Sequence, residues 1–193
     1  MNLPHDFKTA QAYGGNSKLP AGGYICKILN ARVENVFGSD KMAFAIDVAE
    51  GEYKGFYQKL FEQKKQADPS AKFPGKYDCF IARQDGSTNP WFKGSIVAIE
   101  KSNPGYDFAS TNGNEKTLVG KLVGVVFGEE EFQGNNGNWY TSVKPVMFRS
   151  ADSIRNGDFE VPEKKRREPK NVGGYMAMGG NTMQEVQDDD LPF

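Results

Sequence analysis

The residues of this chain that could do chemistry are mostly aromatic rings with lysines beside them. Tyr53, Tyr57, Lys59 and Phe61 occupy odd positions of one short stretch, so an extended strand would place them on one face. Rings on such a face can stack on flat ligands, and each stacked nucleobase contributes about 1 to 3 kcal/mol. Lysines on the same face can follow a phosphate backbone. The pattern predicts a groove suited to nucleobases.

Two other segments contribute to the predicted groove. One is the preceding strand, where Ala43 and Ala45 on the solvent side are small enough to let a flat ligand approach. The other follows a turn at 134–137. For any single ring, burial in the core is the alternative, because small barrels fill their interior with aromatic side chains. The predicted DNA contacts are Lys41, Tyr53, Tyr57, Lys59, Phe61, Trp139, Tyr140 and Lys144.

Residues typical of catalysis are few, and we expect no catalytic residue, cofactor or metal. His5 is the only histidine, and the chain has no nucleophile elbow, phosphate-binding glycine loop or zinc-protease motif. Cys26 and Cys79 are the only cysteines, so Cys and His cannot complete a four-ligand zinc site, and we interpret both as reduced structural thiols. Carboxylates brought together by folding, such as those at 129–131, leave a metal-dependent nuclease as an alternative.

Charge is balanced overall but unevenly distributed along the 193 residues. The chain has 24 Lys and Arg against 25 Asp and Glu, so the total gives no sign of a nucleic-acid partner. Residues 1–150 hold 18 basic and 16 acidic side chains, whereas residues 171–193 hold no basic and 4 acidic side chains. No apolar run approaches the roughly 20 residues that span a bilayer, and the first ten residues do not resemble a signal peptide. We therefore expect an intracellular protein with no membrane partner.

Hydrophobic periodicity predicts the elements that would position these side chains. Alternation over 24–28 and 42–48 predicts two strands joined by a turn at 38–40, and 53–61 is interpreted as a third strand. Residues 118–127 and 140–148 predict two more strands, which pair as a hairpin. Between the third and fourth strands, Asn89-Pro90 and an apolar face over 91–99 predict a helix. The segment 77–81 is either a further strand or a helical turn.

This order predicts a mainly β fold, the five-stranded Greek-key barrel called the OB-fold, with one helix between strands three and four and a disordered C-terminal tail. Residues 62–90 form a long insertion before the helix. The predicted domains are a flexible N-terminal arm at 1–20, the OB-fold single-stranded DNA-binding domain at 21–160, a disordered linker at 161–187 and an acidic partner-binding tip at 188–193. The basic run at 164–167 is interpreted as a solvated charge cluster, with a weak phosphate contact as the alternative.

The C-terminal tip has the composition of a docking peptide. Its three carboxylates form a concentrated anion, its proline stiffens an extended end, and its Leu and Phe are apolar anchors that no local core can bury. An acidic solubilising tail is the alternative, but it leaves the terminal Phe without a purpose. The predicted partner-binding residues are Asp188, Asp189, Asp190, Leu191, Pro192 and Phe193.

The end DDDLPF, with the Gly-rich linker before it, resembles the acidic tip of bacterial single-stranded DNA-binding proteins (SSB), with Leu where many members have Ile. Two body segments, WFKGSIVAIEKSNPGYDF at 91–108 and WYTSVKPVMFRSADSIRNGDFEVP at 139–162, are similar to single-stranded DNA-binding proteins of phages and mobile elements of Gram-positive bacteria. The resemblance implies an OB-fold that coats single strands in the cytoplasm of a bacterial host. It also implies a tail that recruits host or phage replication, recombination and repair proteins.

Together these features predict a non-enzymatic, sequence-tolerant single-stranded DNA-binding protein. Its partners would be single-stranded DNA and, through the tip, other proteins, and it could form a homo-oligomer. The alternatives are an interaction adaptor that keeps the tip but has no DNA affinity, and the nuclease named above.

Overall fold

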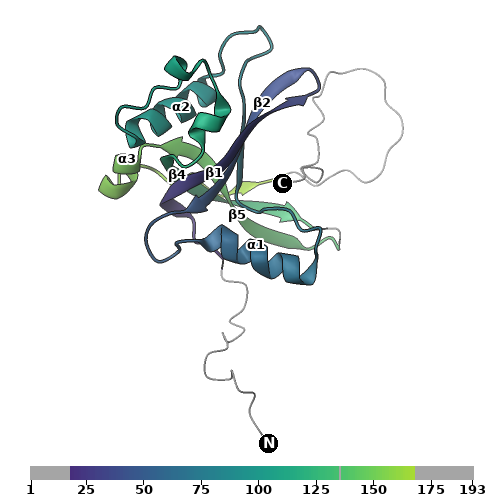
Figure 1. Ribbon diagram of the computed structural model, residues 1–193. Coiled ribbons are helices and arrows are strands. Elements are labelled where there is room, and N and C mark those ends of the chain that lie inside the picture. Colours follow the sequence, from purple (N-terminus) through teal and green to yellow (C-terminus); the bar gives the residue numbers. More distant parts are fainter. Residues whose placement is uncertain (1–17, 135, 168–193) are drawn as a thin grey trace, which may run out of the picture.

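The structure is mainly β, as the sequence predicts. The computed structural model describes residues 18–134 and 136–167, and Figure 1 shows how their elements are arranged. None of the helices in these two ranges is long and apolar enough to cross a membrane. The elements in chain order are β1 (Gly22–Val36), β2 (Ser39–Val48), α1 (Phe56–Ala67), β3 (Lys76–Phe80), α2 (Pro90–Ser102), η1 (Ala109–Thr111), η2 (Glu115–Leu118), β4 (Leu122–Gln133), β5 (Trp139–Arg149), α3 (Ala151–Asn156) and β6 (Lys165–Arg166).

One sheet organises these elements. Its strands follow the order β3-β2-β1-β4-β5 with antiparallel neighbours, and β6 adds to β4 in parallel. The sheet curls until its two ends approach, because Tyr77 of β3 stacks on Phe148 of β5 with ring centroids 4.3 Å apart. The fully buried ring of Phe44 on β2 lies beside both. The result is a barrel-like sheet with an aromatic core.

The strands predicted at 24–28 and 42–48 are confirmed as parts of β1 and β2, although 42–48 is buried on both faces and not on one. Phe44, Ile46 and Val48 of β2 are buried in the core, as expected for one face of a strand. The hairpin turn is shorter than predicted, because Val36 already pairs with Ser39. Two-residue hairpin turns of this kind need positive φ at both central positions, and the two residues at 37–38 have φ of 48° and 81°.

The predicted third strand at 53–61 is wrong, because most of it is the first half of helix α1. The chain enters α1 through Gly55, whose φ of 74° is left-handed. The carboxylate of Asp47 on β2 then accepts hydrogen bonds from the backbone N–H groups of Tyr57, at 2.8 Å, and Gln58, at 3.3 Å. These donors have no partner within the helix, so the buried carboxylate caps the helix from the neighbouring strand.

The third strand of the chain is instead β3, which settles the open interpretation of 77–81 as largely a strand. Tyr77 points into the core and its hydroxyl lies 3.3 Å from the hydroxyl of Ser95 on α2. The inserted segment ahead of α2 therefore supplies both a helix and an edge of the sheet.

The predicted helix at 91–99 is confirmed as α2. The side chain of Asn89 caps it by accepting from the backbone N–H of Trp91 at 3.0 Å, and Pro90 occupies the first turn. At the other end, the Asn103 side chain donates to the carbonyl oxygens of Ile99 and Leu122, at 2.7 and 2.8 Å. This single amide fixes the end of α2 to the start of β4.

The predicted hairpin of the fourth and fifth strands is confirmed as β4 and β5, with a bulge opposite 126–127. The fourth strand starts later than predicted, at Leu122, because the chain up to Leu118 forms the short helix η2. The predicted boundaries of the flexible segments differ from the structure at both ends. Leu19, assigned to the N-terminal arm, is buried in the core, and β6 lies within the first part of the predicted linker. Residues 1–17 of the arm, 168–187 of the linker and the whole tip lie outside the described residues.

Candidate nucleic-acid interface

The half of the β4–β5 hairpin that lies next to its turn presents different side chains on its two faces. Side chains alternate along a strand, so Trp139 shares a face with Val143, which packs against the core. Tyr140 and Lys144 point to the opposite face, where the ring of Tyr140 lies 5.9 Å from that of Phe132. Trp139 and Tyr140, both predicted DNA contacts, therefore lie on opposite faces of one hairpin.

Both of these aromatic residues are accessible. Trp139 is 37% exposed and Tyr140 is 44% exposed. The Tyr140 hydroxyl accepts a hydrogen bond of 2.6 Å from the Asn136 side chain, which orients the ring beside the turn. The guanidinium of Arg166 lies over the Trp139 ring, 4.0 Å from its centroid. Cationic and aromatic groups are thus in contact at the start of β5.

The tip of the β1–β2 hairpin carries a ring that the sequence analysis missed. Phe37 is 85% exposed and has a left-handed backbone, which is rare for a bulky side chain. The side chain of Asn35 stabilises this turn by accepting from the Gly38 N–H at 3.1 Å and donating to the Asp40 carboxylate at 2.9 Å. An aromatic residue directly before a hairpin glycine, with no apolar residue to pack on at the tip, was the available signal.

The solvent side of β2 is more crowded than predicted. Lys41 is mostly buried and its ammonium lies 2.9 Å from the carboxylate of Asp78 and 3.7 Å from that of Glu34. Ala43 and Ala45 are buried, so the solvent side of β2 is not the open approach to neighbouring rings that the sequence analysis expected. The reason is that cross-strand neighbours on β1 and β3 carry long or charged side chains on the same face.

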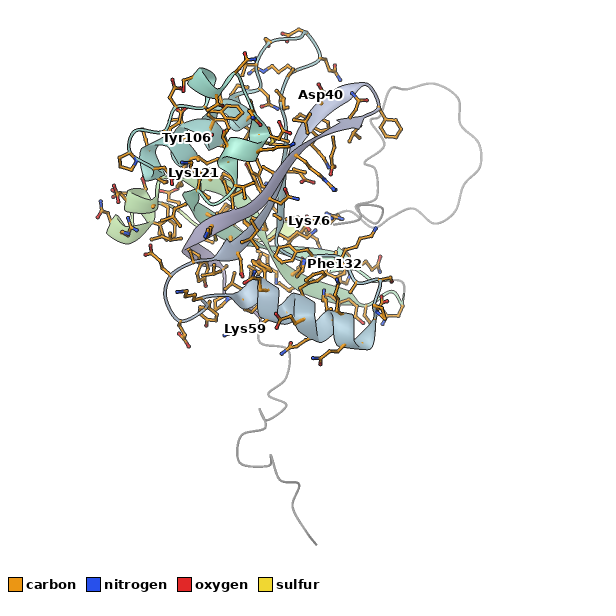
Figure 2. The ribbon with its side chains drawn as sticks, in the orientation of Figure 1. Asp40, Lys59, Lys76, Tyr106, Lys121 and Phe132 are labelled. Carbon is orange, nitrogen blue, oxygen red and sulfur yellow. The ribbon has the colours of Figure 1, made fainter. Side chains whose placement is uncertain are left out.

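Three of the four residues predicted on the third strand are packed into the protein instead. Tyr57 is 5% exposed and stacks on the core ring of Phe127, so it has no free face for a base, and burial raises the pKa of its hydroxyl. Tyr53 and Phe61 are partly buried against other rings. Lys59 remains exposed on α1, along the bottom of the view in Figure 2.

Basic side chains of residues 164–167, hereafter the basic strap, are bound to the acidic part of β4. Lys164 and Arg166 lie 2.6 and 3.6 Å from the carboxylate of Glu131. Arg167 lies 3.3 Å from Glu130, which also pairs with the predicted contact Lys144 at 3.0 Å. The hydrogen bond from Lys164 lowers the pKa of the Glu131 carboxyl. The predicted solvated cluster is therefore an ion-paired element.

The two hairpins lie on the same side of the molecule in the view drawn. Figure 2 shows Lys76 at the start of β3 between the β1–β2 hairpin, where Asp40 is labelled, and the β4–β5 hairpin, where Phe132 is labelled. Exposed rings at the hairpin ends, with cations nearby, can stack on flat ligands and contact anionic groups.

Groups suited to other chemistry are sparse in the part of the chain that the structure describes. Within 18–134 and 136–167, no three His, Cys, Asp or Glu residues lie close enough to hold a metal ion. Both cysteines are buried, and desolvation raises the pKa of Cys26 and raises that of Cys79 to about 12. Such thiols stay protonated near neutral pH, and a protonated thiol is a poor nucleophile.

Comparison with known proteins adds no relative. No protein-family model matches the chain, and no curated protein matches it.

Proposed function

We propose that this protein binds single-stranded DNA, without catalysing a reaction on it, and that its barrel-like sheet is an OB-fold. The sheet curls over an aromatic core, and its five-strand path contains two hairpins with exposed ends. In an OB-fold, the loops that join the first to the second strand and the fourth to the fifth strand grip oligonucleotides. These two loops correspond to the β1–β2 and β4–β5 turns of this chain.

The observation that carries the proposal is the exposure of rings at both hairpin ends. Phe37 lies at one end, and Trp139 and Tyr140 lie at the other. Burying these rings on folding would have been favourable, so their exposure together marks a binding surface. Every base has a flat face, so stacking on such rings gives affinity without sequence preference.

Charge supports the proposal more weakly. Residues 18–134 and 136–167 hold 22 Lys and Arg against 19 Asp and Glu, so this part of the chain is slightly basic. Binding to the phosphate backbone releases counterions, and affinity should fall with salt at a slope of roughly −0.7 per phosphate neutralised.

The acidic tip completes the proposal. The resemblance of DDDLPF to the tip of bacterial SSB proteins supports a role in recruiting replication, recombination and repair proteins to coated strands in a bacterial cytoplasm. The chain would then coat and protect single strands while its tip presents them to other proteins.

Titration of a labelled oligo-dT, followed by fluorescence anisotropy at low and moderate salt, tests the proposal. Trp139→Ala should weaken binding by about 1 to 3 kcal/mol if the ring stacks on a base. Trp91→Ala is the control for loss of an exposed indole outside the β4–β5 hairpin, because Trp91 is 58% exposed and lies in the first turn of α2. The control should bind like the wild type.

Three results would contradict the proposal in different ways. Absence of oligo-dT binding together with capture of proteins by the tip would favour an adaptor. Cleavage of the oligonucleotide on addition of magnesium would favour a nuclease. Equal affinity for single strands and duplex, unchanged by Trp139→Ala, would indicate charge-driven binding without stacking.

A further inference from the structure

The far half of β4 has a charge that does not suit a nucleic-acid surface. Glu129, Glu130 and Glu131 follow one another there, directly before the exposed rings of the hairpin. Unpaired carboxylates at this position would repel a phosphate backbone approaching Trp139 or Tyr140. Some other element must neutralise these glutamates if the hairpin binds DNA.

The basic strap supplies this element, and it is joined to β4 by its backbone as well as by its charges. Lys165 and Arg166 pair in parallel with Glu130 and Glu131 as strand β6. The Arg167 N–H donates to the Glu131 carbonyl oxygen at 2.8 Å. The three ion pairs described above add to this pairing. The strap therefore has a defined register on β4.

The strap also contributes directly to the ring surface. The Arg166 guanidinium lies 4.0 Å from the centroid of Trp139, which is a cation–π contact. Trp139 remains 37% exposed beside it, so the ring is only partly covered. Within the described residues, the exposed side chain of Lys165 makes no ion pair. Its ammonium can therefore meet a phosphate.

We propose that the basic strap is part of the nucleic-acid site, and that the β4–β5 hairpin is incomplete as a binding surface without it. This inference rests on the proposed function and extends it. The strap's four cations outnumber the three glutamates Glu129, Glu130 and Glu131, so docking converts an acidic surface into a basic one. Arg166 supports the Trp139 ring from one side, a base stacks on the part that remains exposed, and Lys165 contacts the adjoining phosphate.

Full-length variants test this inference with a matched pair. The strap variant K164Q/K165Q/R166Q/R167Q removes four positive charges from β6 and its flanks. The control variant K93Q/K101Q/K116Q/R155Q removes the same charge from exposed positions on α2, η2 and α3, on the opposite side of Figure 1 from the β4–β5 hairpin. We expect the strap variant to lose about tenfold or more in oligo-dT affinity at low salt, and the control to lose clearly less.

Replacing Glu130 and Glu131 distinguishes two roles of the strap, the neutralisation of these glutamates and the direct contact of its cations with DNA. Adding E130Q/E131Q to the strap variant should restore much of the lost affinity, because the repulsion disappears together with the carboxylates. A strap that acted only as a phosphate contact would show no rescue. Equal losses in the strap and control variants, or absence of rescue with unchanged thermal unfolding, would overturn the inference.

Docking of the strap can be measured without DNA, which separates this inference from the proposed function. The Arg167 N–H should be protected from hydrogen exchange in the wild type and less protected in E130Q/E131Q, where the ion pairs are removed. Wild-type protein that fails to bind oligo-dT would reject the proposed function. Wild-type protein that binds while its strap amide is unprotected in the free and the bound state would reject only the strap.

Discussion

Replacing Phe37 with Asn should stabilise the protein and weaken its binding to single strands. The Phe37 backbone is left-handed, with φ of 48°, and this conformation costs a bulky L-residue about 1 to 2 kcal/mol. Asn followed by Gly is the preferred pair for a two-residue hairpin turn of this type. The ring is 85% exposed, so its removal sacrifices little burial. We expect a gain of about 1 kcal/mol in the free energy of unfolding.

The same substitution removes a ring that we propose stacks on a base. Loss of one stacking interaction costs about 1 to 3 kcal/mol, which corresponds to a roughly 5-fold to 150-fold loss of affinity. Thermal unfolding should show a melting temperature about 2 to 4 °C higher, since 1 kcal/mol has an effect of this size in a chain of this length. Anisotropy titration of the same preparation with oligo-dT should show the weaker binding.

Gly38→Ala provides the opposite control. Gly38 has φ of 81°, and outside its two chain neighbours no heavy atom lies within 4 Å of the point that a Cβ would occupy, so an added methyl group strains only the backbone. This variant should melt lower while keeping the Phe37 ring and most of the affinity. A Phe37→Asn variant that melts no higher than the wild type and binds oligo-dT equally well would show that the Phe37 ring neither strains the turn nor stacks on a base.

Three further predictions concern the core, the thiols and the tip. Asp47→Ala should lower the free energy of unfolding by about 2 to 3 kcal/mol, and Asp47→Asn by less, because Asn keeps an acceptor for the first turn of α1; urea unfolding measures both. Buried Cys26 and Cys79 keep their protons above the ordinary pKa of 9.0 while the unfolded chain loses them, so urea unfolding should show stability falling above pH 9, by about 1.4 kcal/mol per thiol at pH 10. Deleting 188–193 should modestly raise oligo-dT affinity at low salt and abolish capture of partners in pull-downs, whereas changing Phe193 alone should abolish capture and leave DNA affinity nearly unchanged.

The sequence predicted the elements whose formation depends on residues close to one another along the chain. The alternation at 42–48 defines β2, and the side chain of Asn89 caps α2 two residues away. The failure at α1 has a physical explanation, because its apolar residues follow helical spacing and occupy both faces of any strand. They are Phe56, Tyr57, Leu60 and Phe61 of α1, together with Tyr53 in the turn just before it.

The candidate site depended on contacts between distant segments, which sequence periodicity does not report. The basic strap gains its structure from glutamates more than thirty residues earlier. Trp139 and Tyr140, predicted from the sequence as DNA contacts, are exposed beside a turn, since a hairpin end offers few neighbours to bury them.

The contact between Tyr77 and Phe148 means that side chains, rather than a backbone ladder, set the circumference of this barrel. Within the described residues, the hydrogen-bonded path runs from β3 to β5 and no ladder joins its two ends. The stacked rings bridge this seam at 4.3 Å between centroids. A point substitution at either ring can therefore widen or narrow the barrel while every ladder hydrogen bond is kept. Evolution could retune the spacing of the two hairpins in this way without rebuilding the sheet.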